Sequence, residues 1–252
     1  MGSRKYLRGN AIPPRCLAAK YQPYEPVPAE TAGYPRRAIA MDCEMGTGRY
    51  GSNELILICV VDFLTGEILI NKLVGPSSRI FDWRTRYSGV RREHMIRAEM
   101  IGDTLNGWRG ARAELWKYMD KNTVLIGHSL NNDLDAIKLA HHNIVDSSIL
   151  AENAVGIGPK WGLKRMCKQL LNINIQTGKK GHDCVEDTLA VRELVLWCMR
   201  NPQRFTDWSA AARLKAIEAM EAMEAMRSTR VRAEEGEEKG MEAEVTKDGD
   251  GG

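Results

Sequence analysis

The sequence predicts an α/β domain in which a mixed β-sheet is flanked by helices on both faces. Apolar segments at 36–44 and 54–63 have the length and composition of buried strands. Thr65 and Gly66 then form a tight turn into a third strand at 67–74, so the second and third strands are expected to form a hairpin. Downstream, helical spacing alternates with short apolar segments, which gives the order βββαβαβαα. Strands interleaved with helices in this way are typical of a layered α/β domain.

The later elements follow from the apolar spacing of the chain after the hairpin. Helices are expected over 104–119, 131–142, 162–171 and 184–200, and short strands at 123–128 and within 143–150. A basic loop that contains DWRTRYSGV, at 82–90, separates the hairpin from the first of these helices.

Composition divides the chain into four parts. Residues 1–35, rich in Pro, Tyr and Arg, are expected to form an extended N-terminal arm, and residues 36–202 the main folded domain. Residues 203–232 contain a segment of high helix propensity in which the triplet EAM repeats. We expect this helix to dock on the surface or bridge solvent, with binding of a partner as the alternative. Residues 233–252 are expected to be a disordered acidic tail.

The charge is uneven along the chain. The net charge of +3 is the sum of −6 in the acidic tail and +9 in the remainder. A basic body suits a polyanionic partner such as nucleic acid. No stretch approaches a membrane span of about 18 apolar residues, and the N-terminus lacks the apolar core of a secretory signal. The six cysteines are scattered without a CxxC pair, so we expect an intracellular protein with reduced thiols and no membrane partner.

The stretch AIAMDCEMGTG, residues 38–48, places two carboxylates one residue apart at the end of the first strand. Side chains alternate faces along a strand, so Asp42 and Glu44 project from the same face. Two like charges this close repel each other and resist burial unless a cation lies between them. Carboxylate oxygens are the ligands that Mg²⁺ prefers. The alternative is a strand end with two solvated charges, because this spacing is common.

A third carboxylate is expected from LIGHSLNNDLDAIKL, residues 125–139. On a helical wheel, Asp133 lies at the edge of the apolar stripe, whereas Asp135 lies far from it, beside Lys138. We therefore expect Asp133 to reach the site and Asp135 to pair with Lys138 on the surface.

The segment GKKGHDCVED, which ends at Asp187, supplies the remaining groups. Asp183 is expected to cap a helix that begins at Cys184, with Glu186 completing a capping box. Asp187 then falls one turn inside the helix, where the helix dipole also favours a carboxylate. His182 precedes the cap on a loop rich in Gly and Lys. An imidazole beside a metal site is suited to general base catalysis near neutral pH, although a lone loop histidine usually has no such role.

Together these residues predict a hydrolytic metal site. The set is Asp42, Glu44, Asp133, His182 and Asp187. Four carboxylates around one point suit two Mg²⁺ or Mn²⁺ ions about 3.5–4 Å apart, the arrangement that promotes in-line displacement at phosphorus. One ion, with His182, would activate a water molecule, and the other would stabilise the leaving 3′ oxygen.

MDCEM, GHSLNNDL and HDCVED resemble the three motifs of the DEDDh 3′→5′ exonucleases, a family with a ribonuclease-H-like fold, that is, a mixed β-sheet flanked by helices. The spelling MDCEM, with DWRTRYSG downstream, is similar to the RNA exonuclease branch. That branch includes ribosomal-RNA-processing exonucleases, the interferon-induced exonuclease and the nuclease subunit of a poly(A) deadenylase complex. The resemblance covers about residues 38–200, and a His at position 182, rather than a Tyr nearer Asp187, is the mark of the DEDDh type.

The resemblance implies a role for each matching residue. The implied metal ligands are Asp42, Glu44, Asp133 and Asp187, with His182 as the general base. Glu44 and the backbone after it would also meet the terminal nucleotide, with Met45 as a packing contact for its base or sugar. Gly46 departs from the family, which commonly has Val there, and the lost apolar contact could weaken the grip on the 3′ nucleotide or broaden substrate choice.

Further substrate contacts are expected around the site. His128 and Asn131 would either contact substrate or order their loop by hydrogen bonds, and we favour the loop role. Trp83 and Tyr87 could stack on a base or pack within the protein. Phosphate contacts could come from the basic residues Arg84, Arg86, Arg91, Arg92, Lys179 and Lys180.

The expected function is hydrolysis of single-stranded RNA from a free 3′ end to nucleoside 5′-monophosphates, with two divalent ions as cofactors. RNA is favoured over DNA because the motifs MDCEM and DWRTRYSG resemble the RNA exonuclease branch. Two alternatives stay open: a single-stranded DNA exonuclease on the same fold, and a nucleic-acid-binding scaffold with a vestigial metal site whose EAM helix recruits a partner. The branch favours the nucleus or nucleolus over the cytoplasm, although no long Lys/Arg cluster supports that location.

Overall fold

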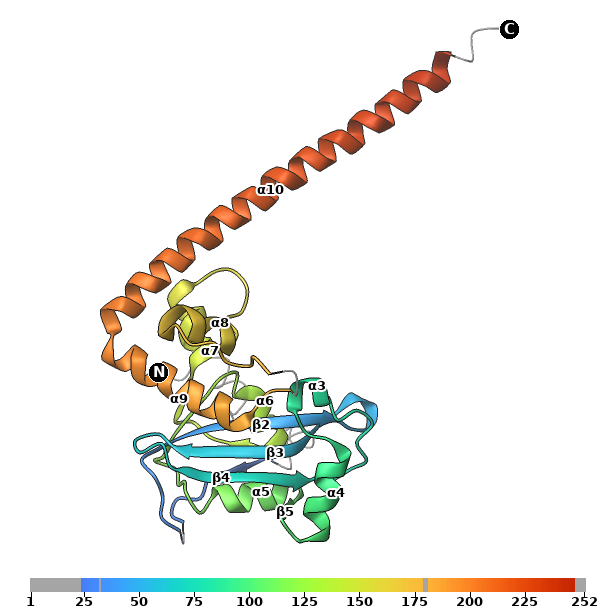
Figure 1. The fold of residues 1–252 in the computed structure, drawn as a ribbon. Coiled ribbons are helices and arrows are strands. Elements are labelled where there is room, and N and C mark those ends of the chain that lie inside the picture. Colours follow the sequence, from blue (N-terminus) through green and yellow to red (C-terminus); the bar gives the residue numbers. More distant parts are fainter. Residues whose placement is uncertain (1–23, 32, 179–180, 248–252) are drawn as a thin grey trace, which may run out of the picture.

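A six-stranded mixed sheet forms the centre of the protein, as seen in a computed structural model that describes residues 24–31, 33–178 and 181–247 (Figure 1). Its strand order is β5-β4-β3-β2-β6-β8. The strands are β2 (Ala38–Thr47), β3 (Asn53–Asp62), β4 (Ile68–Gly75), β5 (Thr104–Asn106), β6 (Val124–Gly127) and β8 (Ile144–Asp146). Strand β3 runs antiparallel to β2 and β4, whereas β2, β6 and β8 are mutually parallel. The predicted mixed sheet is confirmed.

Helices cover both faces of this sheet (Figure 1). They are α3 (Thr85–Ser88), α4 (Arg92–Met100), α5 (Gly107–Leu115), α6 (Asn131–Ile137), α7 (Ser147–Val155), α8 (Leu163–Met166), α9 (Cys184–Arg200) and α10 (Pro202–Lys247), with a short 3₁₀ turn η2 (Arg49–Gly51) and a π-helical turn η3 (Cys167–Leu171). Helices α5 and α6 share a core with one face of β2, and α7, α8 and α9 share a second core with the other. Because both faces of the central strands are covered, those strands are apolar almost throughout.

The hairpin between β3 and β4 forms as the turn residues predicted. The Asp62 carboxylate accepts hydrogen bonds from the N–H groups of Leu64 and Thr65 (2.8 and 2.9 Å), which tightens the turn. Gly66 has φ +79°, a left-handed conformation that glycine adopts without a Cβ clash.

The spacing predicted one helix over residues 104–119, and that prediction is wrong. Thr104–Asn106 is strand β5, which pairs parallel with β4, and the helix begins at Gly107. Gly107 allows this change of direction because its φ is +61°. Helix α4 was missed because its only buried residue is Met95, so it has little apolar periodicity.

The helix predicted over 131–142 is also shorter than expected. It ends at Ile137, and Lys138 takes a left-handed conformation (φ +54°) that terminates it. The next two residues form strand β7 (Leu139–Ala140), which pairs with β1 (Glu25–Pro26) from the N-terminal arm. A partner strand distant in sequence therefore replaced the last helical turn.

The end of the N-terminal arm is docked on the domain. Arg112, buried on α5, pairs with the Glu25 carboxylate (2.7 Å) and donates to the Lys138 carbonyl (2.8 Å). This guanidinium therefore joins the β1 and β7 segments to α5. The arm's residues 1–23 lie outside the described residues.

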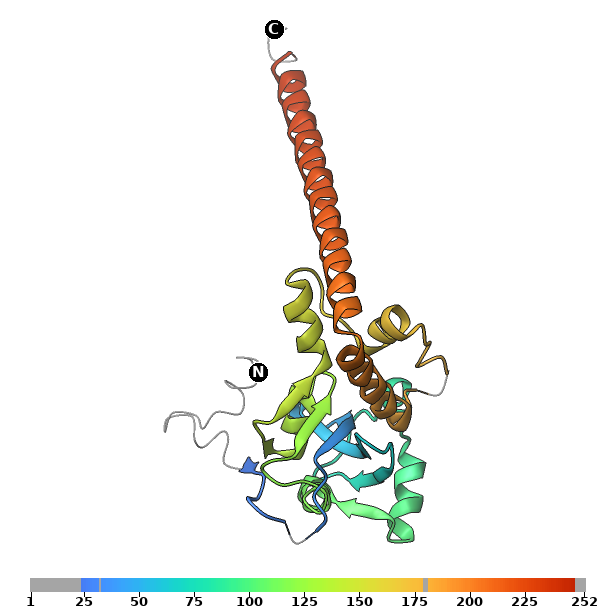
Figure 2. The same ribbon diagram turned by 90° about the vertical axis from the view of Figure 1, so that its left-hand side faces the viewer.

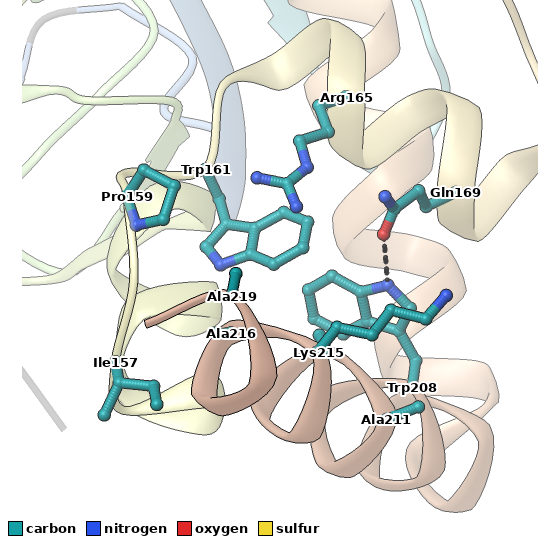
Figure 3. A pocket seen from close by; sticks show the side chains of 11 residues that line it. Ile157, Pro159, Trp161, Arg165, Gln169, Trp208, Ala211, Lys215, Ala216 and Ala219 are labelled. Carbon is teal, nitrogen blue, oxygen red and sulfur yellow. Dashed lines mark hydrogen bonds between the residues drawn. The ribbon is translucent and has the colours of Figure 1, made fainter. Parts of the chain in front are cut away.

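Helix α10 begins against the domain and then extends away from it (Figures 1 and 2). Phe205, Trp208 and Ala212 pack on the core shared by α7, α8 and α9. Figure 3 shows Trp208 beside Trp161, with ring centroids 4.8 Å apart, and the Trp208 indole N–H donating to Gln169 Oε1 (2.9 Å). These side chains line a cavity of about 420 Å³ that contains none of the predicted site residues.

The EAM repeat lies on the part of α10 that leaves the domain. Met220, Met223 and Met226 are each more than half exposed. Residues three apart are rotated by about 60° around a helix, so the three methionines lie within an arc of about 120° on one side of it. The helix continues to Lys247, through most of the segment 233–252 that was expected to be disordered. Glu, Ala and Lys propagate a helix well, whereas charge alone had been taken to prevent one. Residues 248–252 lie outside the described residues, and the division into four parts stays a prediction.

Two further expectations concern cysteines and membranes. The cysteines that the structure describes are free thiols, and four of them, Cys43, Cys59, Cys167 and Cys184, are buried as expected. Cys16 lies outside the described residues. Within the described ranges, no helix combines the length and the apolar character that crossing a membrane requires.

Candidate active site

Strand β2 carries Asp42 and Glu44 toward the face covered by α9. Ile39 and Met41 pack in the core with α5 and α6, so the residues that alternate with them face the other way. The pairing of β2 with β3 shifts by one residue between Glu44 and Met45, and such a bulge increases local twist where the carboxylates lie. Asp42 is partly buried and Glu44 is 9% exposed. The prediction that both carboxylates share one face is confirmed.

Asp187 and His182 come from the start of α9. The Asp183 carboxylate accepts hydrogen bonds from two backbone N–H groups of the first turn (3.0 and 3.3 Å), so it caps the helix as predicted. Asp187, one turn in, is buried, and its Oδ2 lies 3.5 Å from His182 Nδ1. Ligand atoms of Glu44, His182 and Asp187 all lie within 4.8 Å of one another. The structure therefore brings together side chains from opposite ends of the domain sequence.

Asp133 approaches the cluster from the start of α6. It is 4% exposed, accepts hydrogen bonds from Cys43, and lies close enough to Asp42 for that charge to raise its pKa. It belongs to neither of the two groups of described residues whose ligand atoms lie within 4.8 Å of one another, so it stands at the edge of the cluster. Asp135 pairs instead with Lys138 (3.5 Å), as expected.

Burial raises the pKa values of all four carboxyl groups, and repulsion from neighbouring acids adds to each shift. Desolvation is the largest cause for each, and it raises the pKa of Asp42 to about 7 and that of Glu44 to about 8. The charge of Asp187 adds to both shifts, and the pKa values of Asp133 and Asp187 are raised as well. A divalent cation favours the ionised forms and would relieve this repulsion. Hard oxygen ligands with an adjacent imidazole fit Mg²⁺ or Mn²⁺.

The metal-free protein is expected to lose stability as the pH rises from 6.5 to 8. The raised pKa values of Asp42 and Glu44, about 7 and 8, lie above those of an unfolded chain, so only the folded state still holds these protons in that window. The free energy of unfolding should fall by about 2 kcal/mol, as measured by urea unfolding in EDTA. Below pH 6.5 His128 opposes the trend. Burial lowers the pKa of this histidine to about 4, so the folded protein loses stability as the pH falls through that range.

Added Mg²⁺ is the control for this prediction. The ion keeps the carboxylates charged, so it should stabilise the protein more at pH 8 than at pH 6.5. A stability in EDTA that is flat or rises across this window would contradict the account of the cluster.

The backbone before α9 is held against α3. The His182 N–H donates to the Tyr87 carbonyl (2.6 Å), and the Tyr87 ring meets the imidazole edge-on at a centroid distance of 6.3 Å. Gly181 has φ +100°, and a Cβ there would lie 2.4 Å from the backbone nitrogen of Gly89. This close approach fixes the position of His182, whose side chain is 37% exposed.

The structure gives a reason for the glycine at position 46. A Cβ there would lie 3.1 Å from the Ile80 side chain and 3.2 Å from the Asp82 carbonyl. The 80–82 segment is held against the end of β2, where the N–H groups of residues 81 and 82 donate to the Thr47 carbonyl. Met45 is partly buried and packs against the core shared with α5 and α6. The lack of a side chain at Gly46 therefore lets the 80–82 segment pack closely against β2. Contact of Gly46 or Met45 with a nucleotide stays a prediction.

His128 and Asn131 make the loop contacts that we favoured. His128 Nδ1 lies 2.8 Å from Ser147 Oγ, and Asn131 donates to Asn132 Oδ1 (3.0 Å). The Asp146 carboxylate also accepts hydrogen bonds from the two backbone N–H groups just after His128 (3.0 and 2.9 Å). Contact of His128 and Asn131 with substrate stays a prediction.

The basic and aromatic candidates near α3 differ in their surroundings. Arg84 Nε donates to Thr47 Oγ1 (2.7 Å), and Trp83 packs on a small core beneath α4. Arg91 lies 3.7 Å from Glu93, and Arg86 and Arg92 are exposed. Tyr87 is 59% exposed beside His182, which leaves its ring open to a base. Lys179 and Lys180 lie outside the described residues.

Sequence reasoning missed two residues at the cluster. The side-chain amide of Gln176 donates hydrogen bonds to both carboxylate oxygens of Asp187. Its backbone N–H donates to the carboxylate of Glu186, which was expected to complete the capping box. Cys184 Sγ lies within 4.8 Å of ligand oxygens of Asp42 and Glu44. A single amide in a loop has no periodicity that would identify it, whereas Cys184 stood inside the quoted HDCVED motif and was considered only as the first residue of the helix.

Comparisons with known proteins agree with this geometry. A family described as 3′-5′ exonuclease matches residues 101–195, which include Asp133, His182 and Asp187. RNA exonuclease 3 of Candida albicans is 37% identical over 65% of this chain and 38% of its own length. Interferon-stimulated 20 kDa exonuclease-like 2 of Homo sapiens is 34% identical over 64% of this chain and 45% of its own.

Solved structures show the same fold. The Pan2 pseudoubiquitin hydrolase-RNA exonuclease module of Saccharomyces cerevisiae, determined with AAGGA RNA, matches with a TM-score of 0.61 and 20% identity, over 78% of this chain and 36% of that one. The Pan2 catalytic unit of Neurospora crassa matches with a TM-score of 0.58 and 22% identity, over 75% of this chain and 31% of that one.

The six-stranded domain is thus a 3′-5′ exonuclease domain with a ribonuclease-H-like fold. Relatives of its sequence are named as RNA exonucleases and interferon-stimulated exonuclease-like proteins. The chain spans about two fifths to half the length of the curated relatives named above.

Proposed function

We propose that this chain hydrolyses single-stranded RNA from a free 3′ end, releasing nucleoside 5′-monophosphates, with two divalent ions, Mg²⁺ or Mn²⁺. The observation that carries the proposal is the meeting of buried carboxylates from β2, α6 and α9 beside a partly exposed histidine. A cluster of acids whose pKa values are raised by burial is costly unless cations occupy it. RNA-acting relatives support the choice of substrate.

The proposed ligands are Asp42, Glu44, Asp133 and Asp187. Ions held there would supply the charge that favours hydroxide as nucleophile and stabilises the leaving 3′ oxygen. Glu44 and Asp187 lie nearest His182, so they would share the ion beside the general base. Asp133, nearer Asp42 and at the cluster's edge, would contribute on the other side.

His182 is the proposed general base. Its imidazole is open to solvent on one side and lies 3.5 Å from Asp187 on the other, so it can take a proton from a water at the cluster. The backbone contact with Tyr87 holds it in place, and the exposed Tyr87 ring is available to stack on a base of the RNA. The exposed Arg86 and Arg92 would contact phosphates without reading sequence.

The test uses a single-stranded RNA labelled at its 5′ end, incubated with the full chain and Mg²⁺ or Mn²⁺. A ladder that shortens from the 3′ end, and that EDTA abolishes, is expected. The matching DNA oligonucleotide should be degraded more slowly. Faster degradation of DNA would make the chain a DNA exonuclease, and binding of both without degradation would leave only the scaffold.

Gly181→Ala is expected to slow RNA hydrolysis by about 10- to 100-fold, because small displacements of a catalytic group are costly. The new Cβ would meet the backbone of Gly89 at 2.4 Å and push His182 away from the cluster. Single-turnover rates on the labelled RNA measure the effect.

Gly102→Ala is the matched control. Gly102 also has a positive φ (+71°), but a Cβ there would meet nothing within 4 Å. It should therefore share the backbone strain and keep the activity. Equal activity losses in the two variants would show that strain, and not the position of His182, was responsible.

A further inference from the structure

Gln176 has no role in the proposed mechanism, yet it contacts the proposed metal ligand Asp187 directly. Its Nε2 lies 3.0 Å from Asp187 Oδ1 and 2.9 Å from Oδ2, so one neutral amide donates to both oxygens of a carboxylate that is only 5% exposed. An amide oxygen in that place would face two negative oxygens. The carboxylate therefore fixes which end of the amide faces it.

The backbone of Gln176 is held as firmly as its side chain. Its φ is +54°, a left-handed conformation that is unfavourable for a non-glycine residue and persists only where the surroundings enforce it. Its N–H donates to Glu186 Oε2 (2.8 Å), and its carbonyl accepts from Lys164 Nζ (2.8 Å). Ile175, the preceding residue, is 3% exposed in the core shared with α9. Two polar anchors and a buried neighbour thus aim one amide at Asp187.

We infer that Gln176 is a positioning residue that orients the Asp187 carboxylate for metal binding. Each carboxylate oxygen has two lone pairs, so an amide that uses one on each side leaves the others free to face Glu44 and His182. A neutral donor also offsets the repulsion among the acids without adding a charge of its own. Partners of this kind typically contribute 10- to 100-fold to metal affinity, by fixing the orientation of the ligand. The inference rests on the proposed metal site.

The test measures Mn²⁺ binding to the full chain without RNA, by the loss of the free-ion signal in electron paramagnetic resonance. Gln176→Met keeps the length of the side chain but removes the donor, and Mn²⁺ affinity should fall about 10-fold or more. Asp187→Asn marks the effect of losing the ligand itself.

A matched variant separates positioning from general structure. Gln169→Met removes an amide that is bonded to the Trp208 indole, at the cavity away from the carboxylates. This variant should bind Mn²⁺ within about twofold of wild type, whatever its unfolding temperature.

The outcomes are distinct. Weaker binding in Gln176→Met alone, with an affinity loss smaller than that of Asp187→Asn, supports the inference. If wild type binds Mn²⁺ and Gln176→Met binds it equally well, Gln176 is only structural and the inference is overturned while the proposed function stands. An equal loss in Gln169→Met would assign the effect to general destabilisation and overturn the inference too. A wild-type chain that binds no Mn²⁺ would overturn the metal site and, with it, the role of Gln176.

Discussion

Asp42→Asn is expected to lower RNA hydrolysis by about 10³-fold or more and, at the same time, to stabilise the metal-free protein. The activity falls because a ligand of the proposed ions is lost. The stability rises because the raised pKa of Asp42, about 7, shows that its ionised form is costly in the folded protein without metal. The gain at pH 8 should be about 2–4 kcal/mol, measured by urea unfolding in EDTA.

Asp135→Asn is the control for that pair of measurements. Asp135 lies on α6, where it is exposed and pairs with Lys138. Its replacement should change neither activity nor stability by much, because exposed ion pairs contribute little. An Asp42→Asn variant that is both inactive and less stable would indicate a damaged fold and would contradict the account of a strained acid cluster.

His182→Ala should slow hydrolysis by about 10²- to 10⁴-fold while leaving the fold intact, because general base catalysis typically contributes that much. The imidazole is partly exposed, and the ring contacts described above are made with Tyr87 and Asp187. The unfolding temperature should therefore move little. Mn²⁺ binding should weaken much less than in Asp187→Asn, because the carboxylates stay in place.

The comparison for His182 is His142→Ala, which removes an exposed imidazole on the loop before β8. That variant should behave as wild type in single-turnover assays. A His182→Ala chain that retains nearly full activity would remove the general base from the mechanism. The metal ligands would then have to act without a protein base.

Local periodicity was enough to predict the parts of the site that lie on regular elements. The alternation of a strand placed Asp42 and Glu44 on one face, and the wheel of a helix separated Asp133 from the surface pair of Asp135 and Lys138. The N-cap of α9 was predicted from Asp183, with Asp187 one turn later. In each case the sequence pattern and the final geometry depend on the same few residues.

Contacts between segments distant in sequence could not be read in this way. The pairing of β1 with β7 shortened α6, and no local pattern identifies a partner more than 100 residues away. Gln176 reaches Asp187 from a loop whose path is set by Lys164 and Ile175. The position of Asp133 at the edge of the cluster likewise follows from packing and not from its place on the helical wheel.

The most direct measurement of the central claim is the number of Mn²⁺ ions that one chain binds. Electron paramagnetic resonance of the full chain, titrated with Mn²⁺ at pH 8, counts bound ions and detects magnetic coupling between ions about 3.5–4 Å apart. The account predicts two coupled ions in wild type and loss of the coupled pair in Asp42→Asn. One ion or none in wild type, or a coupled pair that survives in Asp42→Asn, would contradict it.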